Sequence, residues 1–427
     1  MFGSRSGKSS YLSRPAASAA AFAMSTLLAA CGGGGGGGGG GGYAPLPTPT
    51  QPGNPAPPTT PTPPVDLGPL YDFTELGVPG STFGVVDHKG IANGGLVAGT
   101  SVDAAGVSHA FFYNGKTNID LGTFGGTNAR AFAVNRCGQV AGWGATPSGI
   151  PHAFFYDGSL HDLGTLGGAE SWALAISTCG KVAGWSVTST GQQHAFYYDG
   201  KTMRDLGTFG GTLSGALDVN AVGQVVGYAA LPGNAVLHAF LYDARTGAPL
   251  QDIGPADRSS QAYDINEAGQ VAISSRGADG LLRAYRYDAG SGALSDLGLL
   301  PDSQGSEPHA LNAAGHVAGY VYYPDGRQVA FVHDGTGMRS LGTLNGGRFS
   351  DANAINASGL VVGYGVDGLV GSEHAVAWGP GYGLVDLNTR VKDLPAGVEL
   401  LSALAVADDG AIVVRTRTGL ALLRPRK

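Results

Sequence analysis

The segment from His194 to Gly227 reads HAFYYDGKTMRDLGTFGGTLSGALDVNAVGQVVG. Variants of it recur from about residue 71 to the end of the chain, at a spacing of about 42–46 residues. The His-Ala-Phe starts of the repeat, or their variants, fall at His109, His152, His194, His238, Arg283, Val329 and His374. Self-similarity at such a period is typical of architectures in which each repeat is one supersecondary unit.

Each repeat contains four short apolar segments, which resemble HAFFY, DLGTFGG, A-x-A-I-N and QVAGW in turn. Glycine, asparagine or aspartate separates them, which is typical of strands joined by turns. No segment has the 3.6-residue periodicity of an amphipathic helix. Four strands in about 40–45 residues match one blade of a β-propeller, whose sheet is apolar on both faces because neighbouring blades cover it.

The ends of the repeat region predict how the ring closes. The region begins with a lone DLG-like segment, Tyr71 to Gly77, and ends with a lone HAF-like segment, Leu420 to Leu423. The first would supply the outer strand of the last blade and leave no open sheet edge. This phase resembles a WD-type repeat and predicts an all-β propeller of eight four-stranded blades. We expect its innermost strands near residues 83–92, 129–136, 171–178, 214–221, 260–267, 307–313, 350–357 and 400–407.

Two kinds of turn recur in the repeats. Asn-x-x-Gly, as from Asn220 to Gly223, lies between the third and fourth segments. There the glycine can adopt positive φ, while the asparagine side chain hydrogen-bonds its own turn. Asn-Gly or Asp-Gly follows the first segment, as at Asn114-Gly115, and predicts two-residue type I′ hairpins. Such a hairpin would pair Tyr113 with Lys116.

The recurrent histidine is the first candidate for chemistry. The predicted register places His109 opposite Asp120 and His194 opposite Asp205. The aspartate is lost together with the histidine in the repeat that begins at Val329. We therefore prefer a structural interpretation to a ligand or a catalytic base: a repeated cross-strand hydrogen bond that satisfies a buried polar pair.

The N-terminus predicts export and lipid attachment. Residues 1–31 have a positive start and an apolar stretch too short to span a bilayer, which is typical of a signal peptide. Leu28 to Cys31 reads LAAC and resembles the bacterial lipobox, in which the cysteine is lipidated. Gly32 rather than aspartate follows Cys31, so the resemblance implies no retention at the inner membrane. We expect a protein of the outer membrane or cell surface, held to the membrane through its lipid anchor.

The next segment predicts a tether. Residues 32–66 are a glycine run followed by a Pro- and Thr-rich stretch, and neither composition buries enough apolar surface to fold. Residues 67–427 form the repeat domain. Charged residues are 13% of the chain and its net charge is −7, with no basic stripe, so nucleic acid is an unfavoured partner.

The repeats resemble those of the HAF-repeat proteins, a family of predicted extracellular bacterial repeat proteins. The match is carried by His-Ala-Phe at residues 109, 152, 194 and 238, by the Asp-Leu-Gly-Thr runs at residues 120, 162 and 205, and by the Gly-Gly pairs after them. It covers residues 71–423 and weakens in the later repeats. The resemblance implies an exported repeat protein and no established activity.

Two further sets of side chains are candidates for binding or cross-linking. Aromatic residues recur at the end of the QVVGY segment, at Trp143, Trp185, Tyr228, Tyr320 and Tyr364. Such a ring could stack a sugar or a peptide, or it could pack between blades. Cys137 and Cys179 occupy the same turn of adjacent repeats, so they are candidates for a disulfide in an oxidising compartment, the alternative being two packed thiols.

The sequence shows no metal-ligand spacing, no nucleophile elbow and no P-loop, so it predicts no metal, cofactor or nucleotide. His88 and His309 occur once each on or near innermost strands and are the remaining catalytic candidates. The favoured hypothesis is a surface-tethered binding or structural module for a glycan or protein ligand. The alternative is an extracellular propeller enzyme, a lyase or a glycan hydrolase, which would need several single-copy titratable groups converging on the axis.

Overall fold

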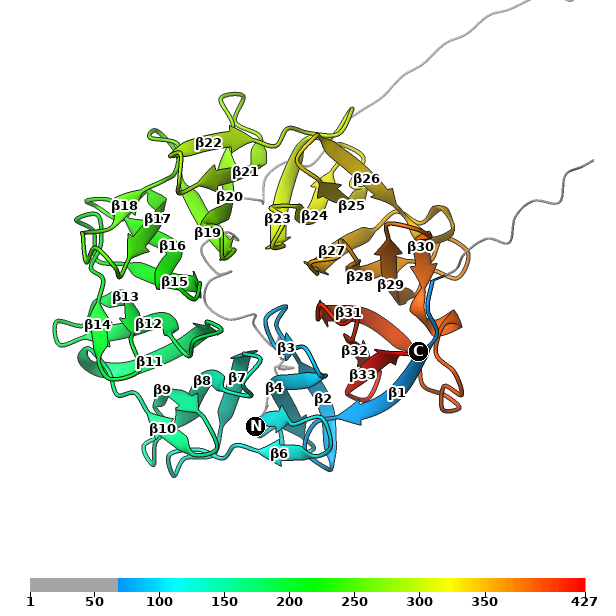
Figure 1. Cartoon of the computed structure of the whole chain (residues 1–427), viewed down its shortest axis with the longest axis horizontal. Coiled ribbons are helices and arrows are strands. Elements are labelled where there is room, and N and C mark those ends of the chain that lie inside the picture. The colour runs from blue at the N-terminus through cyan, green and yellow to red at the C-terminus, as the bar shows by residue number, and fades with distance from the viewer. Residues whose placement is uncertain (1–67, 427) are drawn as a thin grey trace, which may run out of the picture. The chain divides into compact units, whose positions relative to one another are not determined.

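Eight antiparallel sheets surround a common axis in the computed structural model, which describes residues 68–426 (Figure 1). The predicted eight-bladed, all-β propeller is therefore confirmed. The signal peptide with Cys31 and the expected tether lie outside the described residues. We number the blades 1 to 8 in chain order. In blades 1 to 7 the innermost strand comes first in the chain, and in all eight blades it lies near the positions expected from the repeat.

The first four blades follow one another around the ring. Blade 1 comprises β2 (Ser81–Val85), β3 (Ile91–Ala92), β4 (Leu96–Asp103), β5 (Ser108–Tyr113) and β6 (Asn118–Asp120). Blade 2 comprises β7 (Ala129–Val134), β8 (Val140–Ala145), β9 (Pro151–Tyr156) and β10 (Leu160–Asp162). Blade 3 comprises β11 (Gly167–Ile176), β12 (Val182–Thr188), β13 (Gln193–Tyr198) and β14 (Met203–Asp205). Blade 4 comprises β15 (Ser214–Val219), β16 (Gln224–Ala230), β17 (Leu237–Asp243) and β18 (Gln251–Asp252).

The remaining blades complete the ring. Blade 5 comprises β19 (Ser260–Ile265), β20 (Gln270–Arg276), β21 (Leu282–Asp288) and β22 (Ala293–Asp296). Blade 6 comprises β23 (Gly305–Leu311), β24 (Val317–Tyr322), β25 (Gln328–His333) and β26 (Met338–Gly342), followed by the 3₁₀ turn η3 (Leu344–Gly346). Blade 7 comprises β27 (Ser350–Ile355), β28 (Val361–Val366), β29 (Glu373–Gly379) and β30 (Gly383–Asp386), followed by η4 (Leu387–Thr389). Blade 8 comprises β31 (Leu400–Val406), β32 (Ile412–Thr416), β33 (Leu420–Pro425) and β1 (Tyr71–Leu76).

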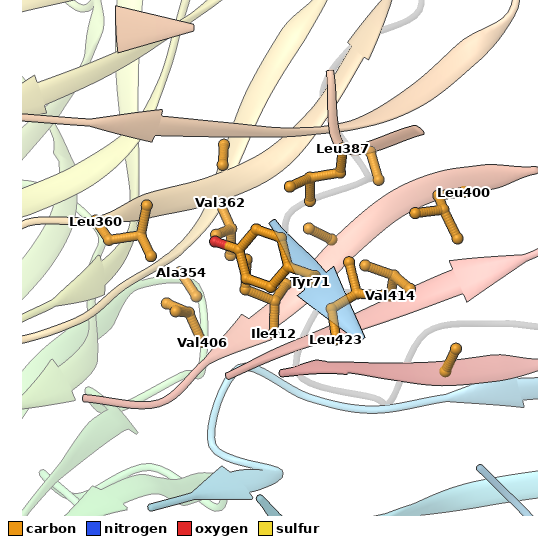
Figure 2. Packing of buried hydrophobic residues seen from close by; sticks show 14 residues of the cluster. Tyr71, Ala354, Leu360, Val362, Leu387, Leu400, Val406, Ile412, Val414 and Leu423 are labelled. Atoms are coloured by element: carbon orange, nitrogen blue, oxygen red, sulfur yellow. The ribbon is translucent and has the colours of Figure 1, made fainter. Parts of the chain in front are cut away.

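Blade 8 joins the two ends of the domain, as predicted. Strand β1 pairs antiparallel with β33, from Tyr71 opposite Pro425 to Leu76 opposite Leu420. Tyr71 is 1% exposed and lies among Leu387, Ile412 and Leu423 (Figure 2). The first strand therefore contributes core packing as well as hydrogen bonds, and it removes the open edge that β33 would otherwise present.

The hydrophobic core is divided among the interfaces between neighbouring blades. One cluster, for example, joins Ala175 and Ala183 of blade 3 to Phe240 of blade 4. The phenylalanine of the HAF motif is fully buried in five blades, at Phe111, Phe154, Phe196, Phe240 and Phe331. Burying one such side chain stabilises the fold by about 1.5–3 kcal/mol. The near-continuous apolar strands are thus explained by burial on both faces.

A bulge interrupts the innermost strand of blades 2 to 8. In blade 3 it places the Trp172 carbonyl oxygen against Gly184 of β12, where an added Cβ would lie inside van der Waals contact. The glycine of the QVAGW segment is needed there for close approach. The same contact recurs at Gly142, Gly227, Gly319 and Gly363.

The Asn-x-x-Gly turn links neighbouring blades as well as closing a hairpin. The Asn135 side-chain oxygen accepts from its own turn at Cys137 N, as predicted, while its Nδ2 donates to Ser177 O of blade 3 at 3.0 Å. The sequence reasoning missed this second bond. Equivalent bonds run from Asn220 to Asn266, from Asn266 to Asn312, from Asn312 to Asn356 and from Asn356 to Ala407.

The predicted two-residue hairpins are wrong. Tyr113 pairs with Asn118 rather than Lys116, because the turn has four residues and the Asn114 side chain accepts from Lys116 N and Thr117 N. Asp120 therefore lies opposite Phe111, two residues from the predicted partner His109. An asparagine side chain can close such a turn without the positive φ at both central positions that type I′ requires.

Candidate binding site on the propeller axis

Blade 1 differs from the other blades at its bulge, and the longer segment there places a lysine across the axis. Val85 pairs with Thr100, and pairing resumes at Ile91 opposite Val97. In between, the single bulge residue of the other blades is replaced by three residues, Asp87 to Lys89, which we call the axial loop. The Lys89 carbonyl oxygen accepts from Val134 N of blade 2 at 3.1 Å.

Lys89 connects the axial loop to the opposite side of the ring. Its Nζ donates to Asp264 Oδ1 at 3.0 Å and contacts Asp218 Oδ2. These aspartates lie on β15 and β19, so blade 1 is joined to blades 4 and 5 across the axis. Each carboxylate also accepts a backbone N–H of the next blade, from Ile265 to Asp218 and from Leu311 to Asp264. The buried charges are therefore paired and hydrogen-bonded, as burial requires.

The axial cluster shifts the pKa values of its members. Burial raises the pKa of Asp218 to about 7, against the lowering effect of Lys89. Burial acts in the same direction on Asp264, but the charges of Lys89 and His88 and the hydrogen bonds to Asp264 together outweigh it and hold that pKa below its usual range. Burial lowers the pKa of His88 to about 4, so this imidazole is neutral at pH 7. Asp218 and Asp264 titrate as a pair, because Lys89 contacts both carboxylates.

An aromatic wall lies on one side of the axis. We define it as Phe132, Trp143, Trp172 and Trp185, which come from blades 2 and 3. The Trp172 ring stacks on Trp185 at a centroid distance of 5.4 Å and lies 5.2 Å from Trp143. Trp172 is half-buried, and the sequence reasoning missed it because it belongs to the innermost strand, outside the repeated QVVGY position.

The predicted aromatic ring is mostly buried between blades. Trp143, Trp185 and Tyr228 are 8%, 7% and 6% exposed, which agrees with the packing alternative for these three. Tyr320 and Tyr364 are half-buried. The five side chains therefore do not form one exposed platform, and only the two tryptophans join the aromatic wall.

Polar side chains of blades 5 to 7 form a second cluster, the polar wall. We define it as Tyr263, Glu307, His309, Tyr320 and Asp351. The Tyr320 hydroxyl donates to Glu307 Oε2 at 2.5 Å, and His309 Nδ1 lies 3.2 Å from Asp351 Oδ1. Burial, followed by the charge of Glu307, raises the pKa of Tyr320. The neutral imidazole of His88 borders this wall, since the charge of His309 contributes to the lowering of its pKa.

The predicted histidine–aspartate pairs lie far from the axis, between the third and fourth strands of their blades. His109 Nδ1 is 2.9 Å from Asp120 Oδ2, and His194 Nδ1 is 2.9 Å from Asp205 Oδ1. The contact is diagonal rather than directly cross-strand, because the turn is longer than expected. The pairs are not buried: the aspartate side chains are 39% and 42% exposed.

Equivalent pairs recur beyond the two that were named. They join His152 to Asp162, His238 to Asp252 and His374 to Asp386. The His152–Asp162 pair keeps the same geometry although its turn is one residue shorter, because Asp162 still lies opposite Phe154.

Cys137 and Cys179 are free, exposed thiols, so the predicted disulfide is not formed in the structure. They do occupy equivalent turns of blades 2 and 3. The bond from Asn135 to Ser177 already joins these turns and sets their separation, while both cysteines point to solvent.

The described residues contain no group of three or more histidine, cysteine, aspartate or glutamate side chains placed to hold a metal ion. Within residues 68–426, no helix is both long enough and apolar enough to cross a membrane.

Comparison with known proteins adds the following. No family model matches the chain, and no curated protein is similar to it. Among solved structures, TolB from Acinetobacter baumannii matches with 15% identity and a TM-score of 0.37. The match covers 68% of this chain and 64% of the TolB chain. An oligogalacturonate lyase from Vibrio parahaemolyticus matches with 10% identity and a TM-score of 0.47, covering 69% of this chain and 94% of that one. The BP39L lectin from Burkholderia pseudomallei matches with 10% identity and a TM-score of 0.42, covering 75% and 98%.

Proposed function

We propose that this chain is a surface-tethered bacterial lipoprotein whose β-propeller is a binding module. The observation that carries the proposal is the axial cluster. Its lysine and two aspartates are buried charged groups that meet at the axis, yet they bind one another and the backbone of neighbouring blades. Groups engaged in this way hold the ring together, which favours a binding or structural module over an enzyme that uses them.

Attachment to the membrane rests on the sequence Leu28 to Cys31 and on the tether that follows. Changing Cys31→Ser should release the protein from the outer-membrane fraction of the producing cells. Immunoblotting of separated membrane and soluble fractions provides the measurement, with the parent chain as the control. Retention of the variant in the membrane would contradict lipid attachment at this cysteine.

The second candidate is an extracellular enzyme, a lyase or a glycan hydrolase. The polar wall favours it, because Glu307, Tyr320, His309 and Asp351 are titratable groups gathered on neighbouring strands. Turnover separates the two functions. A binding module leaves the mass of a bound glycan unchanged. An enzyme forms cleavage products, and the Glu307→Gln variant should no longer form them.

A further inference from the structure

The histidine–aspartate pair of blade 7 differs from the other pairs in what faces the second ring nitrogen. His374 Nδ1 lies 2.7 Å from Asp386 Oδ2, as in the repeated pair, but His374 Nε2 lies 3.0 Å from Ser372 Oγ. At His194 and His238 the same nitrogen is buried without a hydrogen-bond partner. The residue two positions before the histidine of the other pairs is Val107, Ile150, Gln192 or Val236. One departure from the repeat therefore places a hydroxyl against this imidazole.

The hairpin between β28 and β29 holds the serine in place. Ser372 directly precedes β29, and residues two positions apart in extended backbone point to the same side, so Ser372 and His374 can meet. Asp367 N donates to Ser372 O at 2.9 Å and closes the hairpin. The Asp367 carboxylate is buried and accepts from Leu369 N at 2.7 Å. The serine therefore lies at the end of a hydrogen-bonded turn, which limits the positions that its hydroxyl can adopt.

The aspartate orients the histidine and selects its tautomer. Asp386 Oδ1 accepts from Asn388 N at 2.9 Å and from Asn388 Nδ2 at 3.0 Å, while Asp386 Oδ2 faces His374. Asn388 is itself hydrogen-bonded to the backbone of Leu400 in blade 8. An ionised carboxylate only accepts hydrogen bonds, so in a neutral imidazole Nδ1 carries the proton and Nε2 accepts from the Ser372 hydroxyl. In this arrangement a histidine can remove the proton of a serine nucleophile.

We propose that Ser372, His374 and Asp386 form a catalytic triad that hydrolyses small uncharged esters. The proposal goes beyond the proposed function and does not depend on it, because the triad lies at the ends of β29 and β30 and uses no residue of the axis. Such triads are recognised by the geometry and the roles of their members, and they occur without a nucleophile elbow. Ser372 is half-buried, and the side chains of His374 and Asp386 are each 16% exposed, so solvent reaches the site.

The surroundings of the serine favour a short aliphatic acyl group. Leu369 and Val370 belong to the same hairpin and are 80% and 68% exposed, more than any other large apolar side chain of the described residues. An acyl chain bound at Ser372 would cover part of this apolar surface. Glu399 Oε1 lies 3.7 Å from His374 Nε2 and would disfavour an anionic substrate, although Arg417 also pairs with this glutamate. The same carboxylate would stabilise the imidazolium that forms during the reaction.

The reaction consists of two acyl transfers. Ser372 Oγ bonds to the ester carbonyl carbon while His374 Nε2 takes the hydroxyl proton. The bond from that carbon to the alcohol oxygen then breaks, and the alcohol leaves with the proton. A water molecule next attacks the acyl-serine and gives a proton to His374, which returns it to the serine oxygen as the carboxylic acid leaves. General acid–base catalysis of this kind contributes about 10²–10⁴-fold to a rate.

The test uses the full-length chain carrying Cys31→Ser. Its free thiols, Cys137 and Cys179, are first blocked with iodoacetamide, because thiols also cleave activated esters. Hydrolysis of p-nitrophenyl butyrate is followed by absorbance. A fluorophosphonate, from which the serine oxygen displaces fluoride, then labels the nucleophile, and mass spectrometry of the peptides locates the label. We expect the phosphonyl group on Ser372.

Three variants test the roles of the residues. Ser372→Ala should carry no label and should lose the ester hydrolysis. His374→Ala should label about 100-fold more slowly, and added imidazole should restore part of the rate, which a purely structural role would not allow. The matched control is Ser148→Ala, because Ser148 lies in the equivalent hairpin of blade 2 and its hydroxyl is bonded to Thr146 instead of a histidine. This control should react like the parent chain, and melting curves check that all variants are folded.

Three results would overturn the triad: a phosphonyl group on a residue other than Ser372 or on none, equal ester hydrolysis by Ser372→Ala and the parent chain, or equal labelling rates for His374→Ala and the parent. None of them changes the mass measurement on a bound glycan that tests the proposed function. The triad and the binding module can therefore fail separately.

Discussion

Replacement of Lys89 by methionine tests whether the axial cluster holds the ring together. The substitution keeps the length of the side chain and removes its charge. Asp218 and Asp264 are 3% and 6% exposed, so they would keep their backbone hydrogen bonds but lose their only described cationic partner. Removing one member of a buried ion pair costs about 3–5 kcal/mol, because an uncompensated charge remains.

The size of the domain converts this cost into a melting shift. The unfolding entropy is about 2.1 cal/mol/K per residue, which for some 360 residues amounts to about 0.75 kcal/mol/K. We therefore expect Lys89→Met to lower the melting temperature by roughly 4–7 °C at pH 8. Calorimetry on the full-length Cys31→Ser chain provides the measurement.

The pKa shifts predict how the stability deficit of Lys89→Met changes with pH. The folded-state pKa of Asp218 is already raised to about 7, and loss of Lys89 removes a charge that lowers the pKa of both carboxyls, so both pKa values rise. A raised pKa means that stability is retained at low pH and lost as pH rises through the folded value. The deficit of Lys89→Met should therefore be smaller at pH 5 than at pH 8. The lowered pKa of His88 acts in the opposite direction, but its main cause, burial, is the same in both proteins, and loss of the Lys89 charge weakens the lowering.

A matched control separates this effect from the general loss of a lysine. Lys181 donates to the exposed Asp199 O at 2.6 Å, so Lys181→Met should change stability by no more than about 0.5 kcal/mol. An equal melting temperature for Lys89→Met and the parent at pH 8, or a deficit that grows toward pH 5, would refute the cluster as a buried ionic link.

Three further predictions concern the fold. Deleting residues 1–77, which removes β1, should lower the melting temperature by more than 10 °C relative to a chain that starts at residue 68. The reason is that Tyr71 leaves the core and β33 becomes an edge strand. Equal melting curves for the two chains would reject the closure. Gly184→Ala should destabilise the domain by more than 1 kcal/mol in urea unfolding, since its Cβ meets the Trp172 carbonyl, whereas Gly337→Ala, with open space around it, should be neutral. Both cysteines of the described domain should react with iodoacetamide without reductant; mass spectrometry showing a protected pair would restore the disulfide.

The blade count and the ring closure could be predicted from the sequence because they follow from local, repeated patterns. Four apolar segments per repeat define four strands, and counting them from Tyr71 to Leu423 defines eight blades and the strand exchange at the ends. The glycine at the end of each Asn-x-x-Gly turn is equally local: Gly223 has a φ of +86°, as a tight turn requires. Each of these features depends on residues close together in the chain.

Register was the first point at which local reasoning failed. The Asn114-Gly115 pair is compatible with a two-residue or a four-residue turn, and the choice shifts every pair beyond it. In the structure the asparagine side chain closes the longer turn. The His109–Asp120 hydrogen bond survives this shift because both side chains are long enough to meet diagonally across the strands.

Only the tertiary structure identified the axial site. Lys89 and Asp264 are 175 positions apart and meet because the closed ring brings blade 1 and blade 5 to the same axis. A signal does exist in the sequence: Asp218 and Asp264 replace the second alanine of the A-x-A pattern, and Asp87 to Lys89 interrupt it. The signal cannot be interpreted within one repeat, because the partner that stabilises a buried charge comes from the far side of the ring. The repeated residues determined the eight-bladed fold of the described domain. The residues that depart from the repeat determined which side chains meet at the axis, because ring closure brings them together.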